Sequence, residues 1–283
     1  MSISNPFIGR HVAALRAVLV FTLLLGVAYP LAMLAIGRIP GLSSRADGSL
    51  IYENGHVVGS RLIGQSFTDA RGNPLPQYFQ SRPSAAGKGY DPTSTSASNL
   101  GPEDVVDTPD RPSLLSQVCA RSAAVGRLEG VDGGRPYCAG DVGAVLGVFY
   151  AHGISGAVTR VVSLNQTSGT PFVSTYRGVR VELAKKGTDY SHAVVIPIRG
   201  DAPAAPVVPP DAVTASASGL DPDISPAYAE LQAARVARVR GIPIATVRSL
   251  IEECTHGRAL GFMGEPGVNV LELNLALDGL SAR

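Results

Sequence analysis

The longest apolar run in the chain lies near its N-terminus, where Ala17–Ile36 (AVLVFTLLLGVAYPLAMLAI) is twenty residues long and carries no charge. A helix rises 1.5 Å per residue, so this run spans roughly 30 Å, the thickness of a bilayer's hydrocarbon core. Arg16 and Arg38 flank it. We therefore expect a transmembrane helix over residues 12–37, preceded by a short tail of residues 1–11. A cleaved signal peptide is the alternative interpretation.

The next pattern along the chain predicts a β-hairpin. Two β-prone runs, residues 49–53 and 56–59, are separated by Asn54-Gly55. This dipeptide is the strongest short hairpin signal, because a type I′ turn needs positive φ at both central residues. Residues 60–67 are a candidate third strand. Residues 78–109 then lose all apolar periodicity and are rich in hydroxyl and amide side chains, which predicts a long loop that is either functional or disordered.

The middle of the chain changes from a helical to a β pattern. Residues 114–128 have helical apolar spacing, whereas residues 137–199 contain short β-rich runs between Gly, Ser, Asn and Thr clusters. These runs are residues 142–150, 157–164, 172–183 and 193–198. A Pro-rich linker, GDAPAAPVVPPD, follows at 200–211. We interpret residues 130–205 as a β-rich insert between a first part of the soluble domain, 38–129, and a second part, 206–283.

The second part is predicted to be mainly helical. Ser225-Pro226 is a good helix start, with the serine as N-cap and the proline at the first helical position, and this helix is expected to end near Arg240. An apolar stripe predicts another helix over residues 244–254. Leucines alternate in the tail as in a strand, but Asn269 with Glu272 forms a capping pair that favours a helix. The fold class is therefore α+β, with one N-terminal transmembrane helix.

Charge supports a membrane anchor and argues against a nucleic-acid partner. The net charge is only +1, from 24 basic and 23 acidic residues, whereas nucleic-acid binders usually have a clear basic excess. Four of the basic residues precede the first acidic residue, Asp47. The chain thus has a basic N-terminal segment and a slightly acidic body, a distribution typical of a membrane-anchored protein.

Motifs for catalysis are missing from the sequence. It has no G-x-x-x-x-G-K-[ST] phosphate loop, no DKTGT phosphorylation motif, no S-x-x-K pair and no G-x-S-x-G elbow. The five histidines show no metal-ligand spacing, so we expect no metal site. Asp221 and Asp223 stand just before a predicted helix, where a solvated turn with capping charges is a simpler interpretation than a cation site.

The three cysteines leave one question open. Cys119 and Cys138 form a disulfide if their domain is in an oxidising exterior, and otherwise stay free. Cys254 lies on a predicted core stripe.

A polar face on the helix that starts at Ser225 is the other candidate site. Gln232, Arg235 and Arg238 recur at a spacing of three residues and therefore share this face. Such a face is usually solvated. A carboxylate, a phosphate or a partner's backbone is the alternative ligand, because guanidinium groups bind oxyanions through two hydrogen bonds.

Four long stretches carry a resemblance to a known family. They are GSLIYENGHVVGSRLIGQSF (48–67), YFQSRPSAAGKGYDPTSTSASNLGP (78–102), DAVTASASGLDPDISPAYAELQAARVARVRG (211–241) and GRALGFMGEPGVNVLELNLALD (257–278). Together with the single N-terminal span, the chain resembles the C subunit of the bacterial Kdp complex, the high-affinity potassium-transporting P-type ATPase. The resemblance implies a non-catalytic accessory subunit, single-pass in the cell membrane, with residues 1–11 cytoplasmic and the soluble domain exterior.

The resemblance also implies partners and two roles. The partners are a channel-like potassium-binding subunit, an ATP-hydrolysing subunit and possibly a small single-span subunit, besides membrane lipid. The chain holds no cofactor of its own, ATP enters only through the complex, and potassium is the ion that the complex transports. One role is assembly and capping of the channel-like subunit's outer mouth. The other is that of a catalytic chaperone, which raises the ATP affinity of the ATP-hydrolysing subunit and is linked to Gln232, with Arg235 three residues further on. Because ATP is cytoplasmic and this topology places Gln232 outside, we favour assembly and capping.

Contact residues and the insert complete the expectations. Gly26 permits close approach of partner helices and Pro30 allows a bend in the membrane helix. Tyr90 and Asn99 are contact candidates in loop 78–102. The family usually joins the two halves of the domain by a short link, so the resemblance implies that residues 130–205 are an addition. The alternative function is a stand-alone membrane-anchored exterior binding module that recruits a ligand through this insert.

Overall fold

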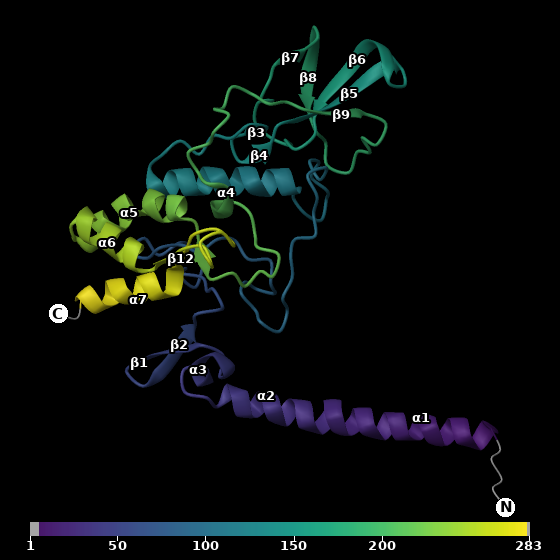
Figure 1. Cartoon of the computed structure of the whole chain (residues 1–283). Coiled ribbons are helices and arrows are strands. Elements are labelled where there is room, and N and C mark those ends of the chain that lie inside the picture. The colour runs from purple at the N-terminus through teal and green to yellow at the C-terminus, as the bar shows by residue number, and fades with distance from the viewer. Residues whose placement is uncertain (1–5, 282–283) are drawn as a thin grey trace, which may run out of the picture. The chain divides into compact units, whose positions relative to one another are not determined.

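The computed structural model describes residues 6–281, and the chain divides into two compact units between Leu62 and Ile63 (Figure 1). The first unit holds the apolar helix and the hairpin, and the second holds the rest of the chain. The soluble part that we predicted over residues 38–129 is thus divided, because residues 38–62 group with the apolar helix.

The apolar helix is confirmed and is longer than predicted. Helix α1 (Pro6–Leu23), a π-helical turn η1 (Leu24–Ala28) and helix α2 (Tyr29–Gly37) follow one another without a break. Phe7–Gly37 is long and apolar enough to cross a membrane, with a mean hydropathy of 2.3. The π turn stands just before Pro30, which has no N–H for a carbonyl four residues back and crowds that carbonyl with its ring. Residues 6–11 of the predicted tail are helical, and residues 1–5 lie outside the described range.

A short helix and the predicted hairpin follow the apolar helix. Helix α3 (Ser43–Ala46) leads into strands β1 (Leu50–Glu53) and β2 (His56–Ser60), which pair antiparallel. Asn54 and Gly55 have φ of 50° and 81°, as the sequence predicted for this turn. The predicted third strand over residues 60–67 is wrong. Residues 61–62 form a turn and residues 64–67 form no strand, and Gly64 donates its N–H to the Leu220 carbonyl at 2.8 Å.

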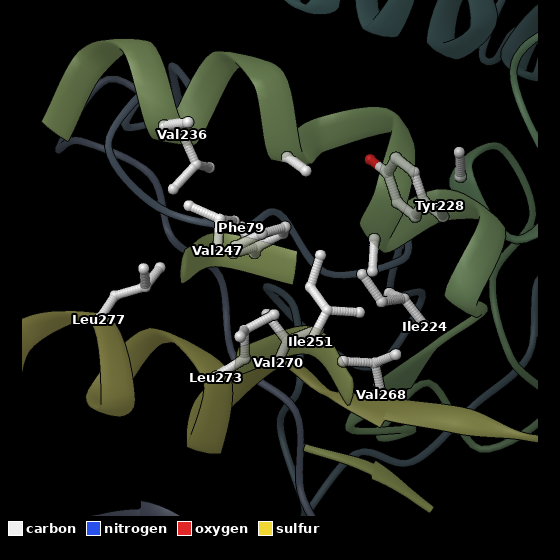
Figure 2. Packing of buried hydrophobic residues seen from close by; sticks show 14 of the residues in the cluster. Phe79, Ile224, Tyr228, Val236, Val247, Ile251, Val268, Val270, Leu273 and Leu277 are labelled. Atoms are coloured by element: carbon white, nitrogen blue, oxygen red, sulfur yellow. The ribbon is translucent and has the colours of Figure 1, made fainter. Parts of the chain in front are cut away.

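The largest hydrophobic core of the second unit lies between helices and a small sheet. Its helices are α4 (Leu114–Glu129), α5 (Pro226–Arg240), α6 (Ile244–Glu253) and α7 (Val270–Ser281), with a short 3₁₀ turn η2 (Pro210–Ala212). The sheet has the antiparallel order β10 (Asp223–Ile224), β12 (Gly267–Asn269), β11 (Thr255–His256). Phe79, from the irregular segment before these elements, is fully buried among side chains of α5, α6 and α7 (Figure 2).

The helix boundaries follow the capping signals in the sequence. Ser225 caps α5 by accepting the Tyr228 N–H at 3.0 Å, and its own hydroxyl and N–H donate to Asp211. The helix ends at Gly241, whose φ is 66°. The ambiguous tail is a helix, and the Asn269 side chain accepts the Glu272 N–H at 3.1 Å.

The strands of the predicted β-rich insert, residues 130–205, lie between residues 138 and 197. They are β3 (Cys138–Ala139), β4 (Val142–Gly143), β5 (Val145–His152), β6 (Ser155–Ser163), β7 (Thr175–Tyr176), β8 (Val179–Leu183) and β9 (Val194–Pro197). Five strands make one sheet in the order β7-β8-β6-β5-β9, antiparallel except for the parallel pair β6 and β8. Both faces of this sheet bury side chains, Val145 and Val162 on one and Leu146 and Val161 on the other.

Covalent and polar links fasten the insert to α4 and the loop before it. The disulfide that the sequence left open joins Cys119 of α4 to Cys138 of β3. The Asn165 amide donates to the Val105 and Gly143 carbonyls, at 2.8 and 3.1 Å, and accepts the Asp107 N–H at 2.8 Å. The insert is therefore an integral part of the second unit.

Candidate functional site

The polar face of α5 is buried and binds the chain's own backbone. Gln232 is fully buried and Arg235 is 2% exposed. The side-chain oxygen Oε1 of Gln232 accepts the Gln80 N–H at 2.7 Å, and its Nε2 donates to the Gln80 carbonyl at 3.1 Å. The expectation of a solvated face is wrong for these two residues, because the segment before Gln80 covers them. Arg238, further along, is exposed.

A second amide holds the neighbouring residue in the same way. The Asn274 side chain of α7 accepts the Phe79 N–H at 2.8 Å and donates to the Phe79 carbonyl at 3.0 Å. Successive residues of an extended chain direct their N–H and C=O groups to opposite sides. Gln232 and Asn274 thus hold Phe79 and Gln80 from two helices, an arrangement that we call the amide clamp. It fixes the Phe79 side chain in the core between these helices (Figure 2).

Arg235, on the same helix face, binds a buried carboxylate and the backbone of the segment that covers this face. Its Nε lies 3.0 Å from both carboxylate oxygens of Glu129, and its Nη1 donates to the carbonyls of Pro76 and Tyr78. Its Nη2 donates to Gln232 Oε1 at 2.9 Å. Burial raises the pKa of Glu129, and the charge of Arg235 opposes this shift. The ion pair joins the end of α4 to α5, so the charges of Glu129 and Arg235 are compensated within the domain.

The clamp leaves little capacity for an outside ligand. Gln232 Oε1 already accepts two hydrogen bonds, and every nitrogen of the Arg235 guanidinium has a protein acceptor. A cavity of about 410 Å³ lies beside the clamp and is lined by Gln80, Arg82, Tyr90 and Arg121, among others. Neither Gln232 nor Arg235 lines it. A ligand that contacted Gln232 directly would have to displace Gln80.

The two carboxylates before α5 have separate partners. Asp221 forms a salt bridge with Arg82 at 2.7 Å, and Asp223 pairs with His256 at 2.8 Å. Neither caps α5, because Asp211 binds the Ser225 cap instead. The predicted solvated turn is therefore wrong: Asp223 begins strand β10, and both carboxylates pair with side chains of other segments. Within residues 6–281 no group of three or more candidate metal ligands occurs.

Loop 78–102 is ordered and packs against residues 216–221. The Ser84 hydroxyl donates to the Gly219 carbonyl at 2.6 Å and accepts the Tyr90 N–H at 2.8 Å. Tyr90 is 9% exposed, and its hydroxyl donates to the Arg82 carbonyl. Asn99 is exposed, with a φ of 53°. Of the two contact candidates in this loop, only Asn99 presents its side chain on the surface of this chain.

Gly26 and Pro30 flank the end of the π turn, so the two candidates of the membrane helix lie close together. Thr22 is the nearest side chain to the space beside Gly26, 3.9 Å from the point that an added Cβ would occupy. This side of the helix is open for a neighbouring helix or for lipid.

Sequence reasoning missed the residues that complete the amide clamp and the ion pair beside it. Gln80 takes part through its backbone, which carries no signal in its residue type. Glu129 and Asn274 are separated from Gln232 by 103 and 42 positions, so spacing could not bring them together. The spacing of Gln232 and Arg235 on one helix face was the one part of this arrangement that the sequence could indicate.

The fold and the site define a class: a protein that has, within residues 6–281, one helix long enough to span a membrane, followed by an α+β unit whose buried polar groups serve its own packing. The chain belongs to the family of the K⁺-transporting ATPase C chain, whose family model matches residues 11–131 and 144–279. It is thus a C-type subunit of a potassium-transporting ATPase.

Named relatives of this family match nearly the whole length of the chain. The potassium-transporting ATPase KdpC subunit of Kineococcus radiotolerans is 40% identical over 264 residues, which cover 93% of this chain and 90% of the relative. The KdpC subunits of Beijerinckia indica and Mycobacterium tuberculosis H37Rv are each 36% identical and match 94% of this chain, covering 91% and 96% of their own lengths.

These matches correct the expectation that residues 130–205 depart from the family. A match over 93% of 283 residues leaves about 20 residues outside it, far fewer than the insert contains. The family match also resumes at residue 144, before β5. The β-rich segment is therefore shared with these relatives.

Proposed function

We propose that this chain acts as an assembly subunit in an ATP-driven potassium uptake complex. In this proposal Phe7–Gly37 crosses the cell membrane with its N-terminus in the cytoplasm, and the soluble unit lies outside and caps the mouth of a channel-like potassium-binding subunit. An ATP-hydrolysing subunit supplies the energy, a small single-span subunit completes the assembly, and potassium is the transported ion.

The amide clamp is the observation that supports assembly over nucleotide binding. Gln232, the residue linked by resemblance to ATP affinity, is fully buried and bonded to Gln80 and Arg235. Exposing it would break two hydrogen bonds to buried backbone groups, and leaving each such group unpaired costs about 1–3 kcal/mol. We infer that Gln232 affects ATP affinity only through the folded state of the domain, without contact to ATP.

The disulfide and the membrane helix support the proposed topology. Disulfides persist in oxidising exteriors and are rare in the cytoplasm, so the Cys119–Cys138 bond favours an exterior soluble unit. The side chains of Phe7–Gly37 are not buried in this chain, which leaves them to lipid and partner helices. Gly26 is our candidate for the point of closest helix approach.

The test of the nucleotide question uses the whole complex. Gln232→Ala is introduced into this subunit, and the apparent ATP KM of the purified complex is measured well below the melting temperature of the variant. We expect an unchanged KM once the amount of assembled complex is matched. A raised KM in fully assembled complex, with Gln77→Ala at the wild-type value, would instead assign Gln232 a part in nucleotide affinity.

The stand-alone binding module is the competing function, and co-purification distinguishes the two. Capture of a channel-like subunit and an ATPase with this chain supports the assembly role. Capture of the chain alone, when both partners are expressed, supports the binding module.

A further inference from the structure

The segment that follows the apolar helix forms a compact collar, residues 38–62. It begins with a sharp reversal in which Ala46 of α3 packs against Gly37 at the end of α2, where an added Cβ would come within 3.2 Å of the Ala46 side chain. Gly41, at a φ of 89°, makes this reversal possible. The collar is therefore held directly at one end of the membrane helix.

A cavity of about 380 Å³ opens in this collar. It is lined by Ser44, Arg45, Ser49, Leu50, Arg61 and Leu62. Backbone contacts shape it, because the Ser49 N–H donates to the Ser44 carbonyl at 2.7 Å and the Arg61 N–H donates to the Ser49 carbonyl at 3.0 Å. Two serines and two arginines thus line a space within the size range of small-ligand sites.

Two arginines of the collar, Arg38 and Arg45, are exposed, and no ion pair to either is found within residues 6–281. The collar's two acidic residues, Asp47 and Glu53, do not line the cavity. Glu53 stands at the turn end of the hairpin, opposite to the end where Leu50 pairs with Ser60. The charge of Arg45 at the cavity is therefore available to an anion.

Two leucines that line this cavity, Leu50 and Leu62, are open to solvent, as are two further apolar residues of the collar. Leu62 is 62% exposed, Ile39 49% and Leu50 42%, while Leu42 is 39% exposed. Guanidinium and hydroxyl groups bind phosphate, and exposed leucines beside them suit acyl chains. Both features lie where a helix long enough to span the bilayer ends, which is where headgroups are found.

We propose that the collar binds an anionic phospholipid, with the headgroup phosphate in the cavity at Arg45 and the acyl chains against Leu42 and Leu62. Arg38 adds to the attraction from the adjoining turn. The shared chemistry is a phosphate anion, and the lipid is the source to which the collar is suited, because a soluble phosphate would leave the surrounding leucines exposed.

The test measures lipid retention by the full chain purified in detergent. Native mass spectrometry counts bound phosphatidylglycerol and phosphatidylcholine after equal additions of each, for wild type, Arg45→Gln and the control Arg71→Gln, which makes the same charge change in the second unit. We expect a preference for phosphatidylglycerol that falls about fivefold in Arg45→Gln, the factor equivalent to about 1 kcal/mol per basic residue at an anionic surface. Arg71→Gln should keep it.

A second variant separates the cavity from general attraction. Ser44→Phe fills the cavity without changing charge, so it should also lower phosphatidylglycerol retention. Equal retention of the two lipids by wild type, equal losses in Arg45→Gln and Arg71→Gln, or wild-type retention in Ser44→Phe would each overturn the proposal. Displacement of the lipid by millimolar glycerol phosphate would overturn the lipid as the source. Near-ultraviolet circular dichroism checks that each variant is folded.

Discussion

At the scale of single residues, buried amides decide how this domain is held together. Gln232 and Asn274 each satisfy both backbone groups of one residue, and this allows a segment without regular structure to pass through the core at Phe79. Buried backbone groups must find partners, and side-chain amides offer a donor and an acceptor at once. Sequence spacing could place Gln232 on a helix face but not reveal that the chain itself covers that face.

Gln232→Ala is expected to destabilise the soluble unit strongly. It removes two hydrogen bonds and leaves the Gln80 N–H and C=O buried without partners, which predicts a loss of about 2–4 kcal/mol in the free energy of unfolding. Urea unfolding of the full chain in detergent measures this loss. Gln77→Ala, at a half-buried glutamine of the same segment, is the control and should change stability by less than about 1 kcal/mol.

The burial of the Tyr90 hydroxyl predicts that the folded state loses stability at alkaline pH. Burial raises the pKa of Tyr90 to about 12, above the value near 10 of an unfolded tyrosine. Between these two values the unfolded chain loses its proton first, so the folded state becomes less stable as pH rises, by about 3 kcal/mol in all.

Tyr90→Phe removes this contribution, although it also leaves the Arg82 carbonyl without its donor. The stability of the variant should therefore start lower at pH 8 and fall less steeply between pH 10 and 12 than that of wild type. Tyr52→Phe, at a tyrosine that is 63% exposed, should follow the wild-type curve. Parallel curves for Tyr90→Phe and wild type would contradict the burial argument.

At the scale of elements, local chemistry predicted most helices and strands. Ser225-Pro226, Asn54-Gly55 and the Asn269–Glu272 pair each gave the correct element, because caps and tight turns depend on neighbours in sequence. The candidate strand at residues 60–67 failed because a β-prone run needs a partner edge, and this run pairs its backbone with Leu220, far along the chain. The structure of loop 78–102 could likewise not be predicted from the sequence, because the loop is held by contacts with residues 216–221, far along the chain.

The disulfide is expected to stabilise the junction of the insert with α4. Cys119 and Cys138 are 19 residues apart, and closing a loop of this length contributes about 3 kcal/mol. The double variant Cys119→Ala, Cys138→Ala should lose stability of this order in chemical unfolding. Cys254→Ala, which removes the free thiol, should lose less. Free thiols at both positions in unreduced peptide maps would contradict the bond.

Gly26 lies in the apolar helix, and the prediction for this residue concerns contact with the helices of partner subunits. Apart from the backbone of its own helix, no atom of residues 6–281 comes closer than 3.9 Å to the point that an added Cβ would occupy, so Gly26→Leu should leave the isolated chain folded. If partner helices approach there, the larger side chain should lower co-purification of the other subunits severalfold. Ala35→Leu, on the same helix, is the matched control. Equal yields with Gly26→Leu and wild type would remove Gly26 from the interface.

At the scale of the whole molecule, membership of the family says more about function than any single site of this chain does. The α+β class, the apolar helix and the β-rich segment could be predicted from patterns, and the long quoted stretches predicted the family. Two features could not be predicted. The division after Leu62 depends on packing, and the presence of the β-rich segment in relatives depends on other sequences. The clamp depends on contacts between distant segments, which no local pattern encodes.

The most direct test of the assembly role is co-purification from cells grown in low potassium. The tagged full chain is extracted in mild detergent, and the captured proteins are identified by mass spectrometry and quantified. An assembly subunit should bring with it a channel-like potassium-binding subunit and an ATP-hydrolysing subunit in fixed proportion. Recovery of the chain alone, from cells in which both partners are shown to be expressed, would contradict this role.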